Sequence, residues 1–138
     1  MTPEKVERFL TAQNQSYLKA LDEVKGGREV SHWMWYIFPQ LKGLGRSETA
    51  QFYAINDIQE AEAYLNHPVL GANLKEISRA LLEVNGKTAH EIFGSPDDLK
   101  LHSSMSLFDQ VEKSDDVFKA VLEKYFNGHS DARTMDLL

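Results

Sequence analysis

Three stretches of the chain carry residue types that could do chemistry, and the first of them surrounds His32. It is Ser31–Gln40, which also contains both tryptophans. At the start of a predicted helix, the helix dipole would favour a neutral imidazole, able to donate a hydrogen bond or shuttle a proton. Trp33 and Trp35 could stack on a base or a nicotinamide-type ring, with Gln40 completing a ligand site. The competing interpretation is a packed histidine on a helix that is buried on all sides.

The second stretch, Lys42-Gly-Leu-Gly-Arg46-Ser47, has features of an anion site. Gly43 and Gly45 would let backbone amides approach a ligand, and Arg46 offers a fork suited to phosphate. Ser47 begins a predicted helix, whose N-terminus favours anions. The spacing matches neither a Walker loop nor a dinucleotide fingerprint. The alternative is that both glycines only supply positive φ angles in a turn.

The third stretch is Asp98–Phe108, in which three serines follow Lys100. Serine is costly inside a helix relative to alanine, so this polar run indicates either a tight helix crossing or a polar pocket. Lys100 would bind an anion or, as an uncharged buried amine, attack a sugar aldehyde; the alternative is a solvated lysine. Asp131 and Asp136 are interpreted first as helix caps and second as acids.

Composition restricts the class of protein. The chain has 138 residues, 42% of them hydrophobic and 26% charged, with no cysteine and a net charge of −6. These values predict one soluble globular domain over residues 1–138, cytoplasmic and without a membrane span or signal peptide. The absence of cysteine and of paired histidine spacing predicts no metal site, and we expect no cofactor. The acidic charge argues against non-specific nucleic-acid binding. The oligomeric state is left open.

The spacing of apolar residues is helical almost throughout, which predicts an all-α domain of about seven or eight helices. Thr2-Pro3 and Gly26-Gly27 bound the first helix. Caps and breakers place the others within Ser31–Pro39, Ser47–Ala54, Asp57–Leu65, His67–Gly86, Ser95–Phe108 and Ser114–Gly128. Thr88–Gly94 is expected to form a single turn, and Asp131–Leu138 a last short turn or helix. A minor short strand pair would fit only at Arg28–Val30 or Gln40–Leu44.

These motifs resemble the domain of unknown function 1810 family, small bacterial proteins that sometimes carry the label calpastatin. The matching pieces span nearly the whole chain in order: Arg8–Gln13, Ser31–Gln40, Gly43–Ser47, Tyr53–Ile55, Tyr64–Gly71, Lys100–Phe108 and Gly128–Thr134. The resemblance implies a mainly α-helical fold and no particular activity. Nothing in the chain resembles the disordered, proline-rich inhibitor repeat to which the label refers.

A second resemblance is to the NADAR group, which acts on ADP-ribose or related N-glycosides. Glu7-Arg-Phe-Leu-Thr-Ala-Gln13 is similar to that group's Glu-x-aromatic-x-x-Ala-Gln helix, and Lys100–Met105 resembles its Lys-x-x-x-Met helix with one additional residue. The resemblance implies that Glu7 is an acid/base or a ribose ligand and Lys100 a Schiff-base nucleophile at the anomeric carbon. It also adds Met105 to the ligand-binding set and assigns the diphosphate to Arg46 and its glycines.

Two classes of function follow from these patterns. The first is a ligand-binding domain for an ADP-ribose-like, nucleotide or sugar-phosphate ligand, with N-glycoside hydrolysis as the reaction if the protein is an enzyme. The second is a non-catalytic interaction or assembly module with the tryptophan-rich helix as its interface. Convergence of Glu7, His32, Gln40, Arg46 and Lys100 in one pocket would favour the ligand. Scatter of these residues, with a tryptophan on an exposed apolar patch, would favour the interface.

Overall fold

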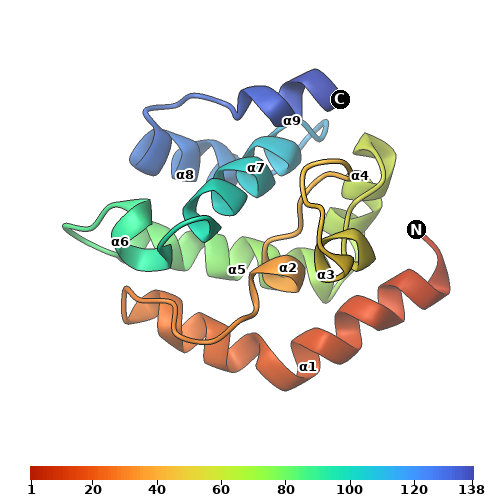
Figure 1. The fold of residues 1–138 in the computed structure, drawn as a ribbon, viewed down its shortest axis with the longest axis horizontal. Coiled ribbons are helices and arrows are strands. Elements are labelled where there is room, and N and C mark those ends of the chain that lie inside the picture. Colours follow the sequence, from red (N-terminus) through yellow and green to blue (C-terminus); the bar gives the residue numbers. More distant parts are fainter.

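The fold is all-α, as predicted (Figure 1). The computed structural model describes residues 1–138, which form nine helices and no β-strand. The helices are α1 (Pro3–Lys25), α2 (Met34–Ile37), α3 (Glu48–Phe52), α4 (Ile58–Asn66), α5 (Leu70–Glu83), α6 (Ala89–Phe93), α7 (Asp97–Asp109), α8 (Asp116–Phe126) and α9 (Ala132–Leu137). None of them combines the length and the apolar character that crossing a lipid bilayer requires.

Capping residues identified in the sequence set most helix boundaries. The Thr2 side chain caps α1, and Pro3 occupies the first helical position. Asp57 caps α4, and Thr88–Glu91 forms a complete capping box at α6. Asp131 caps α9, which confirms the first interpretation of that residue. Each cap satisfies an amide that the helix leaves without a partner, so a local signal defines the start of the element.

The segment Ser31–Pro39 differs from the prediction, because only α2 within it is helical. Ser31 is not a helix cap: its amide and its hydroxyl both donate to the Glu23 carboxylate of α1, at 2.9 and 2.8 Å. The helix count of nine exceeds the predicted seven or eight, since α2, α3, α6 and α9 are helices of only four to six residues.

The predicted short strand pair is reduced to one parallel bridge between Leu41 and Ile55. The Lys42 amide donates to the Ile55 carbonyl at 2.7 Å, and the Ile55 amide donates to the Gln40 carbonyl at 2.8 Å. Gly43 follows with φ of +102°, a conformation that ends the pairing. The bridge fixes residues 42–46, which we call the glycine turn, beside the segment between α3 and α4.

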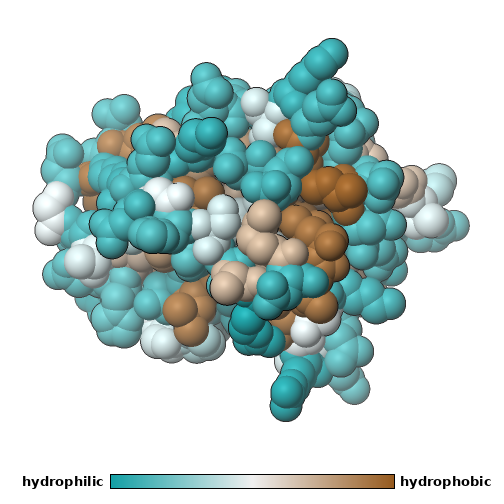
Figure 2. Space-filling model, turned by 90° about the horizontal axis from the view of Figure 1, so that it is seen from above, coloured by the Kyte–Doolittle hydropathy of each residue, from teal (hydrophilic) through white to brown (hydrophobic).

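The helices are arranged with α1 along one side of the molecule, α5 through the middle and α7, α8 and α9 on the opposite side (Figure 1). α5 packs against both α1 and α8, and α7 packs against α8. One cluster of 32 buried hydrophobic residues joins these elements. Seen from above, the surface is mainly hydrophilic with scattered hydrophobic groups, of which the most extended lies right of centre (Figure 2).

The serines of α7 belong to a tight helix crossing. Ser103 and Ser106 each donate to the carbonyl four residues earlier, at 3.1 and 2.7 Å. Ser103 also donates to the Asp131 carboxylate, and Ser106 accepts from the Asp131 amide. Ser104 is fully buried without a hydrogen-bond partner. These small side chains allow α7 and α9 to pack closely, which decides between the two explanations of the polar run.

Candidate functional site

A cavity of about 550 Å³ gathers positive charge between the start of α1, the glycine turn and the segment between α3 and α4. Its cationic residues are Lys5 and Arg8 from α1 and Lys42 and Arg46 from the glycine turn, against the single carboxylate of Glu60. We call it the basic cavity. Its other lining residues are Thr2, Gly43, Gly45, Gln51, Ala54 and Asn56. In a chain with a net charge of −6, this grouping creates a local positive potential.

Lys5 and Glu60 form a buried ion pair in the wall of the basic cavity. Each side chain is only 10% exposed. Lys5 also donates to the Ala54 carbonyl, and Glu60 accepts from both the backbone amide and the side chain of Asn56. Removing either member would leave a buried charge without its partner, so the pair holds α1 firmly against the segment that precedes α4.

Lys42 and Arg46, by contrast, are exposed and form no ion pair. The turn that carries them requires glycine for two different reasons. Gly43 has a positive φ, whereas a Cβ on Gly45 would lie 2.4 Å from the Ala50 Cβ of α3. Ser47 caps α3 by accepting from the Ala50 amide. The backbone therefore presents both cations to the solvent side of the cavity.

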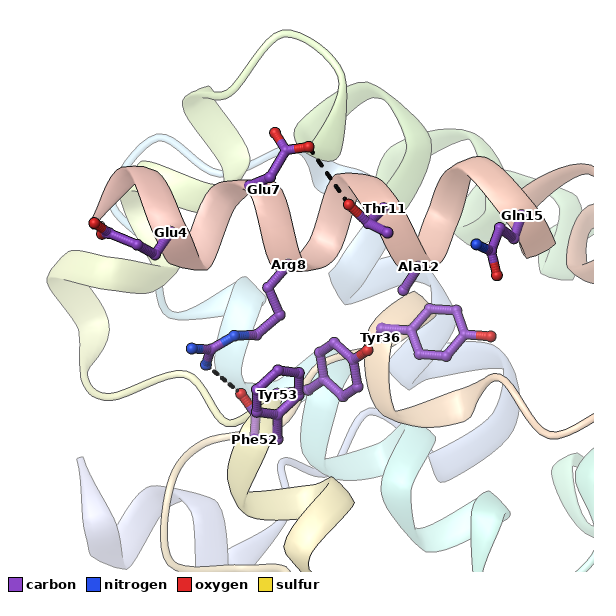
Figure 3. A pocket seen from close by; sticks show the side chains of 9 residues that line it. All are labelled: Glu4, Glu7, Arg8, Thr11, Ala12, Gln15, Tyr36, Phe52 and Tyr53. Atoms are coloured by element: carbon purple, nitrogen blue, oxygen red, sulfur yellow. Dashed lines mark hydrogen bonds between the residues drawn. The ribbon is translucent and has the colours of Figure 1, made fainter.

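A second cavity, of about 600 Å³, runs along α1 (Figure 3). We call it the aromatic groove, because Tyr36, Phe52 and Tyr53 lie in a row beneath the helix. The ring centroids of Phe52 and Tyr53 are 4.9 Å apart, and those of Tyr36 and Tyr53 are 5.3 Å apart. The remaining lining residues are Glu4, Glu7, Arg8, Thr11, Ala12 and Gln15.

Arg8 lines both cavities. Its Nη1 donates to the Phe52 carbonyl at 2.6 Å, and its guanidinium carbon lies 4.0 Å from the centroid of the Phe52 ring. The Phe52 side chain remains 50% exposed. Arg8 has no carboxylate partner, so its charge is available to an anion at the boundary between the two cavities.

Glu7 and Lys100, the expected acid/base and nucleophile, lie in different places. The Glu7 carboxylate points away from the aromatic rings in Figure 3 and accepts from the Thr11 hydroxyl at 3.4 Å. Lys100 lies on α7, with Nζ 5.2 Å from the centroid of Trp35 and 3.3 Å from Oδ1 of Asp97. Neither the basic cavity nor the aromatic groove contains Lys100.

The other expected site residues also lie in different parts of the fold. Trp33 is 1% exposed and belongs to the core, as does the fully buried Met105. Trp35 is half-buried, and with Gln40 it lines a hollow of about 10 Å³, which is too small for a ligand. His32 is exposed on the segment before α2 and is not at a helix start. Of the expected residues, the basic cavity brings together Gly43, Gly45 and Arg46.

A pair of acids next to Lys100 was not expected from the sequence. Glu29 lies within hydrogen-bond reach of Asp97, and its Oε2 is buried without a partner among the donors of the protein. Burial, the hydrogen bond and charge of Asp97, and the charge of Glu23 together raise the pKa of Glu29 to about 9, while Lys100 opposes the shift. This shift favours the protonated form of the Glu29 carboxyl, in which it would share its proton with Asp97.

Glu23 organises the segment that leads to α2. Its carboxylate accepts from the Val30 amide, from the amide and hydroxyl of Ser31, and from the Trp33 indole N–H at 3.0 Å. Burial acts to raise the pKa of Glu23, but these hydrogen bonds outweigh it and lower the pKa to about 2. The sequence predicted that Ser31 caps a helix, whereas in the structure Ser31 is bound by the Glu23 carboxylate.

Replacing Glu23 with alanine is expected to lower the free energy of unfolding by about 2–3 kcal/mol, because the Trp33 indole loses its acceptor and the Val30 and Ser31 amides lose theirs. Glu23→Gln keeps an acceptor oxygen and should lose less. Urea unfolding followed by tryptophan fluorescence measures both, with the exposed Glu112→Ala as control. A Glu23→Ala variant as stable as Glu112→Ala would contradict this assignment.

The sequence analysis missed Lys5, Arg8, Phe52 and Tyr53 as site residues. Arg8 and Tyr53 belong to motifs quoted for the family resemblance, which is the one signal that marks them. No three histidine, cysteine, aspartate or glutamate side chains come together in an arrangement that could hold a metal ion.

The fold defines an all-α protein of nine helices around one hydrophobic core. The chain belongs to the family described as protein of unknown function DUF1810, which it matches over residues 3–138, and this confirms the first resemblance. Among solved structures it is similar to the conserved hypothetical protein Rv1873 from Mycobacterium tuberculosis. The two are 45% identical with a TM-score of 0.96, over 99% of this chain and 98% of that chain. No curated protein matches the chain. Neither match bears on the NADAR similarity, which stays a hypothesis.

Proposed function

We propose that this protein binds a small phosphorylated metabolite, a nucleotide or a sugar phosphate, in the basic cavity. The observation that carries the proposal is the grouping of four cationic side chains around one cavity in a chain with a net charge of −6. Lysine offers a point charge to phosphate, and arginine offers a planar fork that can bind two oxygens at once.

The four cationic side chains of the basic cavity differ in whether they have an ion-pair partner. Lys5 is committed to Glu60, whereas Lys42, Arg46 and Arg8 have no ion-pair partner. Three uncommitted cations match the charge of a phosphate monoester or a diphosphate. The volume of about 550 Å³ lies within the range of small-molecule sites, roughly 300–1,000 Å³.

The proposal is limited to binding. Hydrolysis of an N-glycoside by Glu7 and Lys100 would need both side chains at one anomeric carbon, whereas Glu7 lines the aromatic groove and Lys100 lines neither cavity. The interaction module is not favoured either, since Trp33 is buried and the Lys100 ammonium lies over the Trp35 ring.

Removing Lys42 and Arg46 together is expected to weaken the binding of inorganic pyrophosphate roughly 10- to 100-fold, since each lost charge-assisted contact costs about 1 kcal/mol or more. Isothermal titration calorimetry at low salt measures the change, and higher salt should weaken wild-type binding. The matched control is the Lys119→Ala/Arg28→Ala double variant, which removes one exposed lysine and one exposed arginine that do not line the cavity. Equal affinity in both double variants, or no binding of pyrophosphate to the wild type, would overturn the proposal.

A further inference from the structure

We infer that the ligand carries a planar aromatic ring, which lies in the aromatic groove while its phosphates occupy the basic cavity. The inference rests on the proposed function and narrows it to a nucleoside phosphate in place of a sugar phosphate.

The two cavities adjoin at a single side chain. Arg8 lines both of them, so an anion that reaches its guanidinium from the basic cavity is already at the end of the aromatic groove. A nucleotide has the same order of parts, with charged phosphates at one end and an aromatic base at the other. A sugar phosphate would fill the basic cavity and leave the groove open to water.

The groove provides a surface on which a ring can stack. Tyr36, Tyr53 and Phe52 lie in a row, with neighbouring centroids 5.3 and 4.9 Å apart and ring planes inclined by 51° and 79°, so a base would stack on one of these rings and meet the edge of the next. The guanidinium of Arg8 lies 4.0 Å from the centroid of Phe52 and covers one face of that ring, so a base would stack on its other face. Half of the Phe52 side chain remains exposed although the protein has a large core to bury it. Exposure of a phenylalanine is costly, and a stacked base would offset that cost.

The opposite wall of the groove suits the edge of a base. α1 contributes the small Ala12, which leaves room above the rings, together with the side chains of Thr11 and Gln15. The Gln15 amide can both donate and accept hydrogen bonds, and the Thr11 hydroxyl, which donates to Glu7, can accept one, as the polar edge of a base requires. The groove volume of about 600 Å³ accommodates a purine.

Calorimetric titration of the wild type with pyrophosphate, ribose 5-phosphate and ADP tests the inference. ADP is expected to bind roughly 5- to 100-fold more tightly than either of the other two, the factor that stacking of one base supplies. Equal affinities for ADP and pyrophosphate would overturn the ring inference and leave the proposed function intact. Failure of all three to bind would overturn the proposed function itself.

Two substitutions of Phe52 test whether the aromatic ring of the ligand lies in the aromatic groove. Phe52→Ala and Phe52→Leu should both lower the affinity for ADP toward the affinity for ribose 5-phosphate. Leucine restores the apolar bulk but has no aromatic face, so it should not restore ADP binding. The readout is the ratio of ADP affinity to pyrophosphate affinity within each variant, because the Phe52 ring also packs against Arg8 and its loss acts on both ligands through that contact. Leu99→Ala, which removes an apolar side chain of similar exposure on α7, is the control. If both Phe52 variants still bound ADP more tightly than ribose 5-phosphate by the wild-type factor, the placement of the ring would be overturned.

Discussion

Replacing Gly71 with alanine is expected to lower the free energy of unfolding by about 3 kcal/mol or more and the melting temperature by roughly 10 °C. Gly71 lies in the first turn of α5, where the chain passes the end of α4. A Cβ at this position would lie 1.9 Å from the carbonyl oxygen of Leu65 and 2.7 Å from its carbonyl carbon. Both of these Leu65 atoms belong to the backbone, so the clash can be removed only if α4 and α5 move apart.

The matched control for this variant is Gly26→Ala. Gly26 also lies at a helix end, but its φ of −76° suits any residue and an added Cβ would meet nothing closer than 3.4 Å. We expect a change within about 0.5 kcal/mol there. Thermal unfolding of both variants by circular dichroism gives the comparison. Similar melting temperatures for the two would show that α4 and α5 do not pack as closely as described.

The stability of the protein should fall as the pH rises from about 4.5 toward 9, because of Glu29. Its pKa is raised from an ordinary value of 4.5 to about 9 in the folded protein. In this interval the folded protein keeps a proton that the unfolded chain has lost, so a higher pH favours unfolding. The contribution of one proton is at most about 1.4 kcal/mol per pH unit, and solvent at the partly exposed pair reduces it.

Glu29→Gln isolates this contribution, since the amide can donate to Asp97 at every pH. Urea unfolding at pH 5, 7 and 9 should show a wild type that weakens with pH and a Glu29→Gln variant that weakens less. Glu112→Gln, at an exposed carboxylate, serves as control and should follow the wild type. If the Glu29→Gln and wild-type stabilities ran parallel across the three pH values, the shared proton would be ruled out.

The helical fold could be predicted because its signals are local. Thr88 and Glu91 satisfy each other's amides within one turn, and Asp131 caps the residues that directly follow it. Ser31 misled the prediction because its partner, Glu23, lies on the preceding helix, beyond the turn at Gly26-Gly27. A cap residue and a residue bound by a distant carboxylate look the same in sequence.

The site was less predictable because its parts meet only in the folded chain. Arg46 and its glycines are adjacent in sequence and line the basic cavity, and the anion site that their pattern indicates stays a prediction. Arg8 contacts Phe52, 44 positions further along, and nothing in the spacing of α1 indicates that contact. The two tryptophans drew attention by their type, whereas burial assigns Trp33 to the core.

The position of α7 determines how the protein can fluctuate. From Ser103 to Phe108 every residue is buried, and the helix packs against α2, α4, α6, α8 and α9. A neighbouring helix cannot detach without exposing part of this surface to water, so partial opening is nearly as costly as complete unfolding. Amide hydrogens of α7 therefore exchange with solvent only when the whole molecule opens. None of the residues of the short α3 is buried, so we expect its amide hydrogens to exchange before those of α7.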